Sequence, residues 1–106
     1  MEWQIEYLRE ALKDLKALDH SQRLQVLKAI DKLSKKPLPS FEEGYGKPLG
    51  NKSTTNLTGY FKIKLLKLGI RVVYGLIRER NTMRVIVISV RADEAVYQIA
   101  MDRIDD

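Results

Sequence analysis

The stretch FKIKLLKLGIRVVYGLI, residues 61–77, decides the fold that the sequence predicts. Its apolar residues fall into two runs, 60–66 and 70–77, and Gly69 lies between them. Successive side chains of a strand point to opposite faces, so the apolar residues of the first run share one face and its lysines share the other. The stretch therefore predicts an antiparallel hairpin that turns near Gly69 and closes a core with one face.

Cations mark the second face of this hairpin. Lys62 and Lys64 are two residues apart in the first run, and Arg71 opens the second run. No acidic residue occurs between residues 47 and 78 to pair with them locally. Either this face is an ordinary solvated surface, or it receives something negatively charged.

The charge of the whole chain favours a polyanionic partner. The net charge is +5, but residues 1–45 carry a net charge of 0, residues 46–80 carry +7 and residues 81–106 carry −2. A concentrated positive block inside a folded domain is typical of proteins that bind nucleic acid or an acidic protein segment. A solvated basic face remains the alternative.

Length and composition exclude several classes of protein. A chain of 106 residues predicts one domain, residues 1–106. The absence of cysteine excludes disulfides and thiolate chemistry, and His20 is the lone histidine, so we expect neither a metal nor a cofactor. The sequence shows no signal peptide and no apolar stretch of the roughly 18 residues that a membrane helix needs, so we expect a cytoplasmic protein with no membrane partner.

Helical patterns precede the hairpin. Residues 3–7 alternate like a short strand, and residues 8–18 follow helical spacing. Asp19 is expected to cap a second helix together with Gln22. The buried stripe of this second helix is predicted to hold Leu24, Leu27, Ile30 and Leu33.

The remaining segments complete an α+β fold. Residues 41–59 are rich in Gly, Pro, Asn and Thr and predict a loop, whereas residues 84–90 predict a central strand. Asp93 is expected to cap a last helix. We therefore predict an N-terminal strand and an αα-hairpin packed on a curled, mainly antiparallel four-stranded sheet, with a short C-terminal helix.

Several segments, taken in order, resemble one known family. They are GKPL at 46–49, LTGYFKIKL at 57–65, GIRVVY at 69–74, VIVISV at 85–90 and AVYQIAMDRI at 95–104. Together they are similar to the RelE-type toxins of the RelE/ParE toxin–antitoxin superfamily, over nearly the whole chain.

The resemblance implies a function and a set of partners. Toxins of this type cleave messenger RNA in the ribosomal A site, without metal, and are inactive until they dock there. A cognate antitoxin wraps the toxin, and the complex of the two binds operator DNA and represses their promoter. The resemblance thus implies a ribosome-dependent endoribonuclease that inhibits translation.

The resemblance also assigns site residues. Its active-site lysines and first arginine match Lys62, Lys64 and Arg71, its tyrosine matches Tyr97, and Arg91 matches the second arginine, with Arg84 as the alternative. Further contacts to RNA are expected from Lys47, Lys52, Lys67 and Arg84.

Elementary chemistry is compatible with this assignment. Cleaving RNA needs a base at the 2′-hydroxyl, cations on the phosphate and an acid at the leaving oxygen. The hairpin has no carboxylate, so these proton transfers are assigned to lysine or tyrosine. Lys62 and Lys64 are about 7 Å apart, and their repulsion is about 0.6 kcal/mol in water but about 2.4 kcal/mol at a dielectric constant near 20. The pair therefore stays largely protonated in free solution. One lysine can become a working base when a large partner encloses it, although the phosphate that it approaches opposes this change.

The residues leave other interpretations open. Arg71 can pair with Glu42, with Glu43 or with the acidic C-terminus, and Tyr97 can simply pack against the sheet edge. A ParE-like inhibitor of DNA gyrase has the same fold, and so does a catalytically inactive protein that binds an antitoxin as a corepressor. The two lysines, Arg71 and Tyr97 favour RNA cleavage over both.

Overall fold

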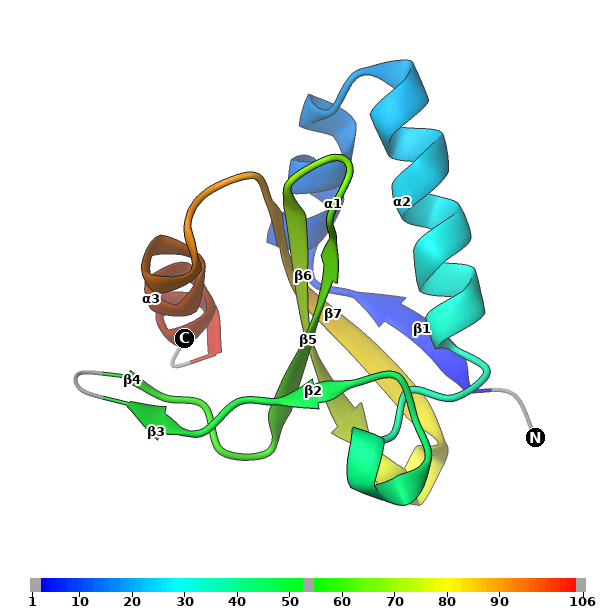
Figure 1. Ribbon diagram of the computed structural model, residues 1–106, viewed down its shortest axis with the longest axis vertical. Helices are drawn as coiled ribbons and strands as arrows, with labels where there is room; N and C mark the ends of the chain where they lie inside the picture. The colour runs from blue at the N-terminus through cyan, green and yellow to red at the C-terminus, as the bar shows by residue number, and fades with distance from the viewer. Residues whose placement is uncertain (1–2, 53–54, 105–106) are drawn as a thin grey trace.

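The computed structural model describes residues 3–52 and 55–104, and its α+β fold confirms the predicted class (Figure 1). In chain order the elements are β1 (Gln4–Tyr7), α1 (Arg9–Ala17), α2 (His20–Leu33), the 3₁₀ helix η1 (Ser40–Glu42), β2 (Lys47–Pro48), β3 (Asn51–Lys52), β4 (Thr55–Asn56), β5 (Tyr60–Leu65), β6 (Ile70–Ile77), the 3₁₀ helix η2 (Arg78–Arg80), β7 (Thr82–Ser89) and α3 (Asp93–Ile104). Within the described residues, no helix is both long enough and apolar enough to span a membrane.

The main sheet has five strands, in the order β1-β7-β6-β5-β2. Its pairs are antiparallel except β1 with β7, which run parallel. The predicted hairpin is confirmed as β5 and β6, and Gly69 turns it with a φ of +66°, a conformation that costs glycine little. The prediction of a plain loop at residues 41–59 was wrong, because that segment supplies the fifth strand β2 and a separate β3–β4 pair.

The two faces of the sheet have separate cores. Helices α1 and α2 cover one face, where Phe61 and Tyr74 are buried against Ile30. Helix α3 lies on the other face (Figure 1), where Val73 is buried with Val96. Phe61 therefore points away from α3, and the neighbouring lysines of β5 point toward it, as the alternation predicts.

The buried stripe of α2 differs from the predicted one. Val26, Ile30 and Leu33 are buried, whereas Leu24 and Leu27 are 47% and 38% exposed. The prediction advanced in steps of three residues, which fall short of a helical turn of 3.6 residues. Over three such steps the error brings Leu24 almost to the opposite side of the helix from Leu33.

One of the two predicted helix caps is confirmed. The Asp19 side chain accepts a hydrogen bond from the Gln22 N–H at 2.8 Å, and the Gln22 side chain accepts one from the Asp19 N–H at 3.4 Å. Asp93 does not cap α3. The helix begins at Asp93 itself, and the Val96 N–H binds the Ala92 carbonyl at 3.0 Å. The Asp93 carboxylate is therefore available for contacts with the sheet.

Candidate functional site

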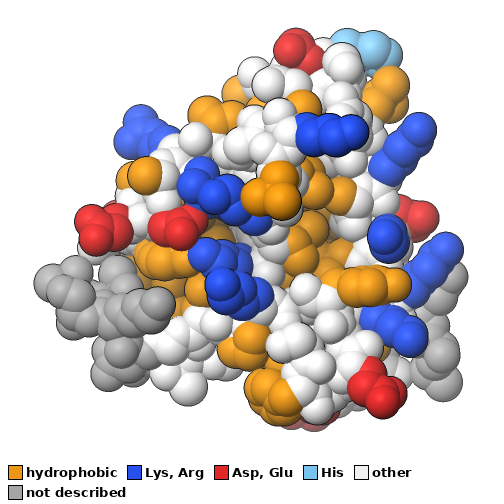
Figure 2. All heavy atoms as spheres, in the orientation of Figure 1, with side chains coloured by type: hydrophobic (Ala, Val, Ile, Leu, Met, Phe, Trp, Pro, Cys, Tyr) orange, Lys and Arg blue, Asp and Glu red, His pale blue; other side chains and the backbone are white. Residues whose placement is uncertain are grey.

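The register of the strands gathers cations on the face that α3 partly covers. Lys47 of β2 lies directly opposite Lys62 of β5, and Lys64 lies directly opposite Arg71 of β6. Residues that face one another across two strands point to the same side of a sheet, with Cβ atoms about 5 Å apart. Figure 2 shows Lys and Arg side chains grouped where β5 passes α3, with acidic side chains beside them.

Lys62 is held by two residues of α3. Its side chain is only 13% exposed, and its Nζ donates to Tyr97 Oη at 2.6 Å and to Asp93 Oδ2 at 3.2 Å. The same Nζ is 5.3 Å from the centre of the Tyr97 ring. These distances place the ammonium beyond the hydroxyl, near the line from the ring centre through the oxygen. The contact is therefore a hydrogen bond rather than a cation–π interaction over the ring face.

Arg71 completes the cluster from β6. Its side chain is 15% exposed, its Nε donates to Asp93 Oδ1, and its Nη1 donates to the Arg91 carbonyl oxygen at 2.7 Å. Each oxygen of the Asp93 carboxylate thus binds a different cation. Asp93 joins β5, β6 and α3 at one point.

These contacts shift the pKa values of the two groups on Lys62 and Asp93. Burial lowers the pKa of the Lys62 ammonium, but its hydrogen bonds to Tyr97 and Asp93 and the attraction of both outweigh burial and raise that pKa. Burial raises the pKa of the Asp93 carboxyl, but hydrogen bonds and attraction from Arg71 and Lys62 outweigh it and lower that pKa. In the free protein both groups are therefore held in their charged forms.

Other predicted site residues surround this cluster without joining it. Lys47, Lys64, Lys67 and Arg91 are exposed, and within the described part of the chain their side chains make no hydrogen bond or ion pair. The backbone of Lys52 lies in β3, but its side chain falls outside what the structure describes. Lys47, Lys64, Lys67 and Arg91 therefore remain available to an external anion.

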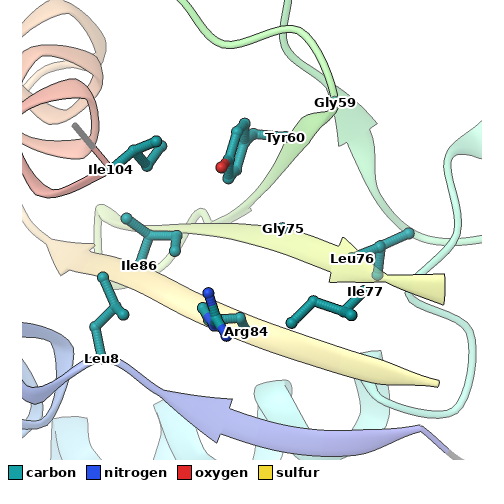
Figure 3. A pocket seen from close by; sticks show the side chains of 9 residues that line it. All are labelled: Leu8, Gly59, Tyr60, Gly75, Leu76, Ile77, Arg84, Ile86 and Ile104. Atoms are coloured by element: carbon teal, nitrogen blue, oxygen red, sulfur yellow. The ribbon is translucent and has the colours of Figure 1, made fainter. Parts of the chain in front are cut away.

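The structure does not bring Arg84 to the cluster. Its partner on β6 is Gly75, four residues from Arg71, which corresponds to about 13 Å along the strand. The Arg84 Nε donates to Glu6 Oε1 at 2.6 Å. Arg84 lines a cavity of about 220 Å³. Figure 3 shows Tyr60 and apolar side chains of β6, β7 and α3 among the other residues that line this cavity.

The sequence did not predict the position of Asp93. Arg71 pairs with this residue rather than with Glu42, which binds Arg78 at 3.0 Å instead. One signal was present: Asp93 precedes Tyr97 by four residues, and residues at that spacing share a helix face. The ionisable groups of the cluster therefore include a carboxylate, which the hairpin alone does not supply.

The geometry is suited to binding a phosphate group. Two largely buried cations converge on one carboxylate, a tyrosine hydroxyl lies within hydrogen-bonding distance of one of them, and exposed lysines flank the cluster. An arginine fork and lysine ammonium groups are ordinary ligands of phosphate. Among residues 3–52 and 55–104, no group of three or more His, Cys, Asp or Glu side chains is placed to hold a metal ion.

Comparisons with known proteins point in one direction. The chain is 30% identical over 104 residues to an Escherichia coli protein described as a RelE-like toxin, a match that covers 97% of this chain and 98% of that protein. A free E. coli RelE variant with two arginines replaced by alanine is 26% identical and has a TM-score of 0.76, over 98% of this chain and 99% of that one. The same variant bound to a peptide of the antitoxin RelB is 25% identical and has a TM-score of 0.70, over 94% and 95% of the two chains. No family model matches the sequence.

Proposed function

Because this chain belongs to the RelE-like toxins of toxin–antitoxin systems, we propose that it inhibits translation by cutting messenger RNA in the ribosomal A site. One observation carries the proposal. Lys62, Arg71 and Tyr97 come from β5, β6 and α3, and a chain of hydrogen bonds through Asp93 links them at one site. These are the residues to which the family resemblance assigns RNA cleavage.

The reaction is an attack of an RNA 2′-hydroxyl on the adjacent phosphate. A bond forms between the 2′-oxygen and phosphorus, the bond from phosphorus to the 5′-oxygen breaks, and the products end in a 2′,3′-cyclic phosphate and a 5′-hydroxyl. The proton of the 2′-hydroxyl passes to a base, and an acid returns a proton to the 5′-oxygen. Charge accumulates on the phosphate oxygens in the transition state, so fixed cations accelerate the step.

The contacts of Lys62 and Lys64 suggest a different role for each lysine in the cleavage reaction. Asp93 and Tyr97 hold Lys62 protonated in the free protein, so in this proposal Lys62 meets the phosphate as a cation and stabilises its charge. Lys64 is exposed and unpartnered beside Arg71, so it takes the role of base once the ribosome encloses it. A proton on lysine is otherwise held too firmly for a base at neutral pH, since the ordinary pKa is about 10.4.

The other residues grip the RNA. Arg71 presents a planar guanidinium that can bind two phosphate oxygens at once. Arg91 is exposed and its side chain is free to reach the leaving oxygen. Tyr97 orients the 2′-hydroxyl or stacks on a base, as aromatic residues commonly do with single-stranded RNA.

A translating extract tests the proposal directly. The protein is added, and new 5′ ends on the messenger RNA are mapped for wild type, Arg71→Ala and Arg78→Ala. Loss of a group that stabilises transition-state charge lowers the rate about 10²–10³-fold, so Arg71→Ala should cut at least 100-fold more slowly. Arg78 is a matched control because it pairs with Glu42 at the surface, where the pair contributes little, and its variant should cut within about twofold of wild type.

The experiment also separates the alternatives. If Arg71→Ala is folded and cuts as fast as wild type, the role of Arg71 is wrong. If wild type yields no new 5′ ends but blocks supercoiling by DNA gyrase, the ParE-like function replaces the nuclease. A chain that does neither and still binds an antitoxin is an inactive corepressor.

We also propose a cognate antitoxin as partner. The E. coli relative with an antitoxin peptide bound covers most of this chain and shares its fold. The segment that covers residues 46–80 should be acidic, since that block carries +7. The exposed Leu24 and Leu27 of α2 give an amphipathic segment an apolar surface to bind. Operator DNA is then a partner only through the toxin–antitoxin complex.

A further inference from the structure

Asp93 occupies the position that an RNA phosphate needs. Its two carboxylate oxygens take the Arg71 Nε and the Lys62 Nζ, one each. The other bonds of these cations go to neutral groups, the carbonyl oxygens of Gly69 and Arg91 and the Tyr97 hydroxyl. Because both cations are at most 15% exposed, a phosphate oxygen cannot reach these donors while the carboxylate remains in place.

We propose that the Asp93 carboxylate takes the place of the substrate phosphate in the free protein. It closes the anion site until RNA binds and displaces it. The RNA part of this inference rests on the proposed function, whereas the closure of the site does not. Asp93 thereby regulates access to Lys62 and Arg71.

The location of Asp93 makes displacement feasible. Its side chain is 42% exposed, so the carboxylate can rotate into water without moving the sheet. It belongs to the first turn of α3, where the helix dipole stabilises a negative charge even after its ion pairs are broken. Val96 and Ala100 anchor the rest of the helix in the core, so Tyr97 keeps its place while Asp93 moves.

The incoming anion also gains an advantage over the carboxylate. A phosphodiester can contact the flanking cations Lys47 and Lys64 as well as the cluster, whereas the carboxylate binds only Lys62 and Arg71. Once the phosphate enters, repulsion between like charges keeps Asp93 out. A lone phosphate ion lacks those extra contacts, and the wild-type site should bind it weakly.

Binding of inorganic phosphate tests the closure. Its dissociation constant is measured by NMR titration, at low ionic strength, for wild type, Asp93→Asn and Glu94→Gln. Asp93→Asn should bind phosphate about tenfold more tightly. This is the effect expected when a negative charge that repels the anion from a few ångströms away is removed at a partly exposed site. Glu94 is the control, because it is exposed, adjacent and of the same charge, and its variant should stay within twofold of wild type.

Two further variants test whether the gain in phosphate affinity depends on Arg71 and whether the asparagine amide affects it. Arg71→Ala combined with Asp93→Asn should lose the gain, because the added affinity depends on the freed guanidinium. Asp93→Ser should repeat the gain if the asparagine amide itself disturbs the site. If both Asp93 variants are folded and bind phosphate no more tightly than Glu94→Gln, the closure by Asp93 is wrong.

The failure of this inference and of the proposed function are distinguishable. Tighter phosphate binding by Asp93→Asn without any messenger RNA cleavage by wild type leaves the closed anion site standing and removes the nuclease. Cleavage by wild type with unchanged phosphate affinity in Asp93→Asn removes the closure and leaves the nuclease.

Discussion

The ion pair between Asp14 and Arg103 should control how firmly α3 is held. Strand β1 pairs with β7 only as far as Val85. Beyond that point the Ile88 N–H donates to Asp14 at 3.0 Å, and the Ile86 carbonyl accepts from Arg103 at 2.8 Å. The two side chains bind each other at 2.7 and 3.0 Å and are 19% and 17% exposed. The pair therefore takes the place of a strand partner at this edge of β7.

Arg103→Ala removes three hydrogen bonds at once and leaves Asp14 charged and partly buried. Losing one partner of a fully buried pair costs about 3–5 kcal/mol, and exposed pairs contribute less than about 1 kcal/mol. The residual exposure of this pair places the expected loss between these limits, at about 2–3 kcal/mol. Helix α3 carries Asp93 and Tyr97, so under the proposed function the cleavage of messenger RNA should also fall in preparations that remain folded.

Urea unfolding monitored by circular dichroism measures this loss, with Asp102→Asn as a control on the same helix. Asp102 is exposed and bound to Gln98 at 3.1 Å, so its replacement should change the free energy of unfolding by less than about 0.5 kcal/mol. Hydrogen exchange of α3 amides should accelerate in Arg103→Ala more than exchange of β6 amides. If Arg103→Ala and Asp102→Asn unfold at the same urea concentration, the pair does not hold α3, and the reasoning from its burial is refuted.

Two more predictions concern stability. The pKa of Asp93 is lowered in the folded state below an unfolded value of about 3.9, so its stabilisation is complete above about pH 5 and is lost as the pH falls through the folded pKa. The stability difference between wild type and Asp93→Asn in urea should therefore shrink from pH 5 to pH 2, and a constant difference would contradict it. A Cβ at Gly46 would lie 2.1 Å from the Tyr74 hydroxyl, so Gly46→Ala should lower the free energy of unfolding by about 1–3 kcal/mol, whereas Gly50→Ala, with open space around it, should not.

The parts of the fold that the sequence predicted have strong periodicity. Residues 61–65 alternate at a period of two, which predicted the face that the lysines share, and the two apolar runs on either side of Gly69 predicted the hairpin. Strands β2, β3 and β4 are two residues long, too short for any period to appear, so residues 41–59 were interpreted as a loop. The stripe of α2 failed because Leu24 and Leu33 fit steps of three residues but not a helical turn.

The part of the candidate site that the residue pattern predicted lies within the β5–β6 hairpin. Lys62, Lys64 and Arg71 lie on neighbouring strands, and their pairing follows from the hairpin. Tyr97 entered through the family resemblance alone. Asp93 is 31 residues from Lys62, and its carboxylate reaches the hairpin only because α3 packs at a particular position and angle. No local pattern encodes such a contact, so a helix cap was the simpler interpretation.

Asp93 therefore has two effects: it stabilises the free protein, and it weakens the binding of phosphate. Its ion pairs tie the first turn of α3 to β5 and β6, so replacing it should lower the stability of the free protein. The same replacement should raise the affinity of the site for phosphate. General loosening of the fold predicts a loss of both, because a disordered α3 no longer presents Tyr97 to Lys62. A variant that is less stable and yet binds phosphate more tightly thus identifies a carboxylate that occupies a binding site, rather than one that merely supports the fold.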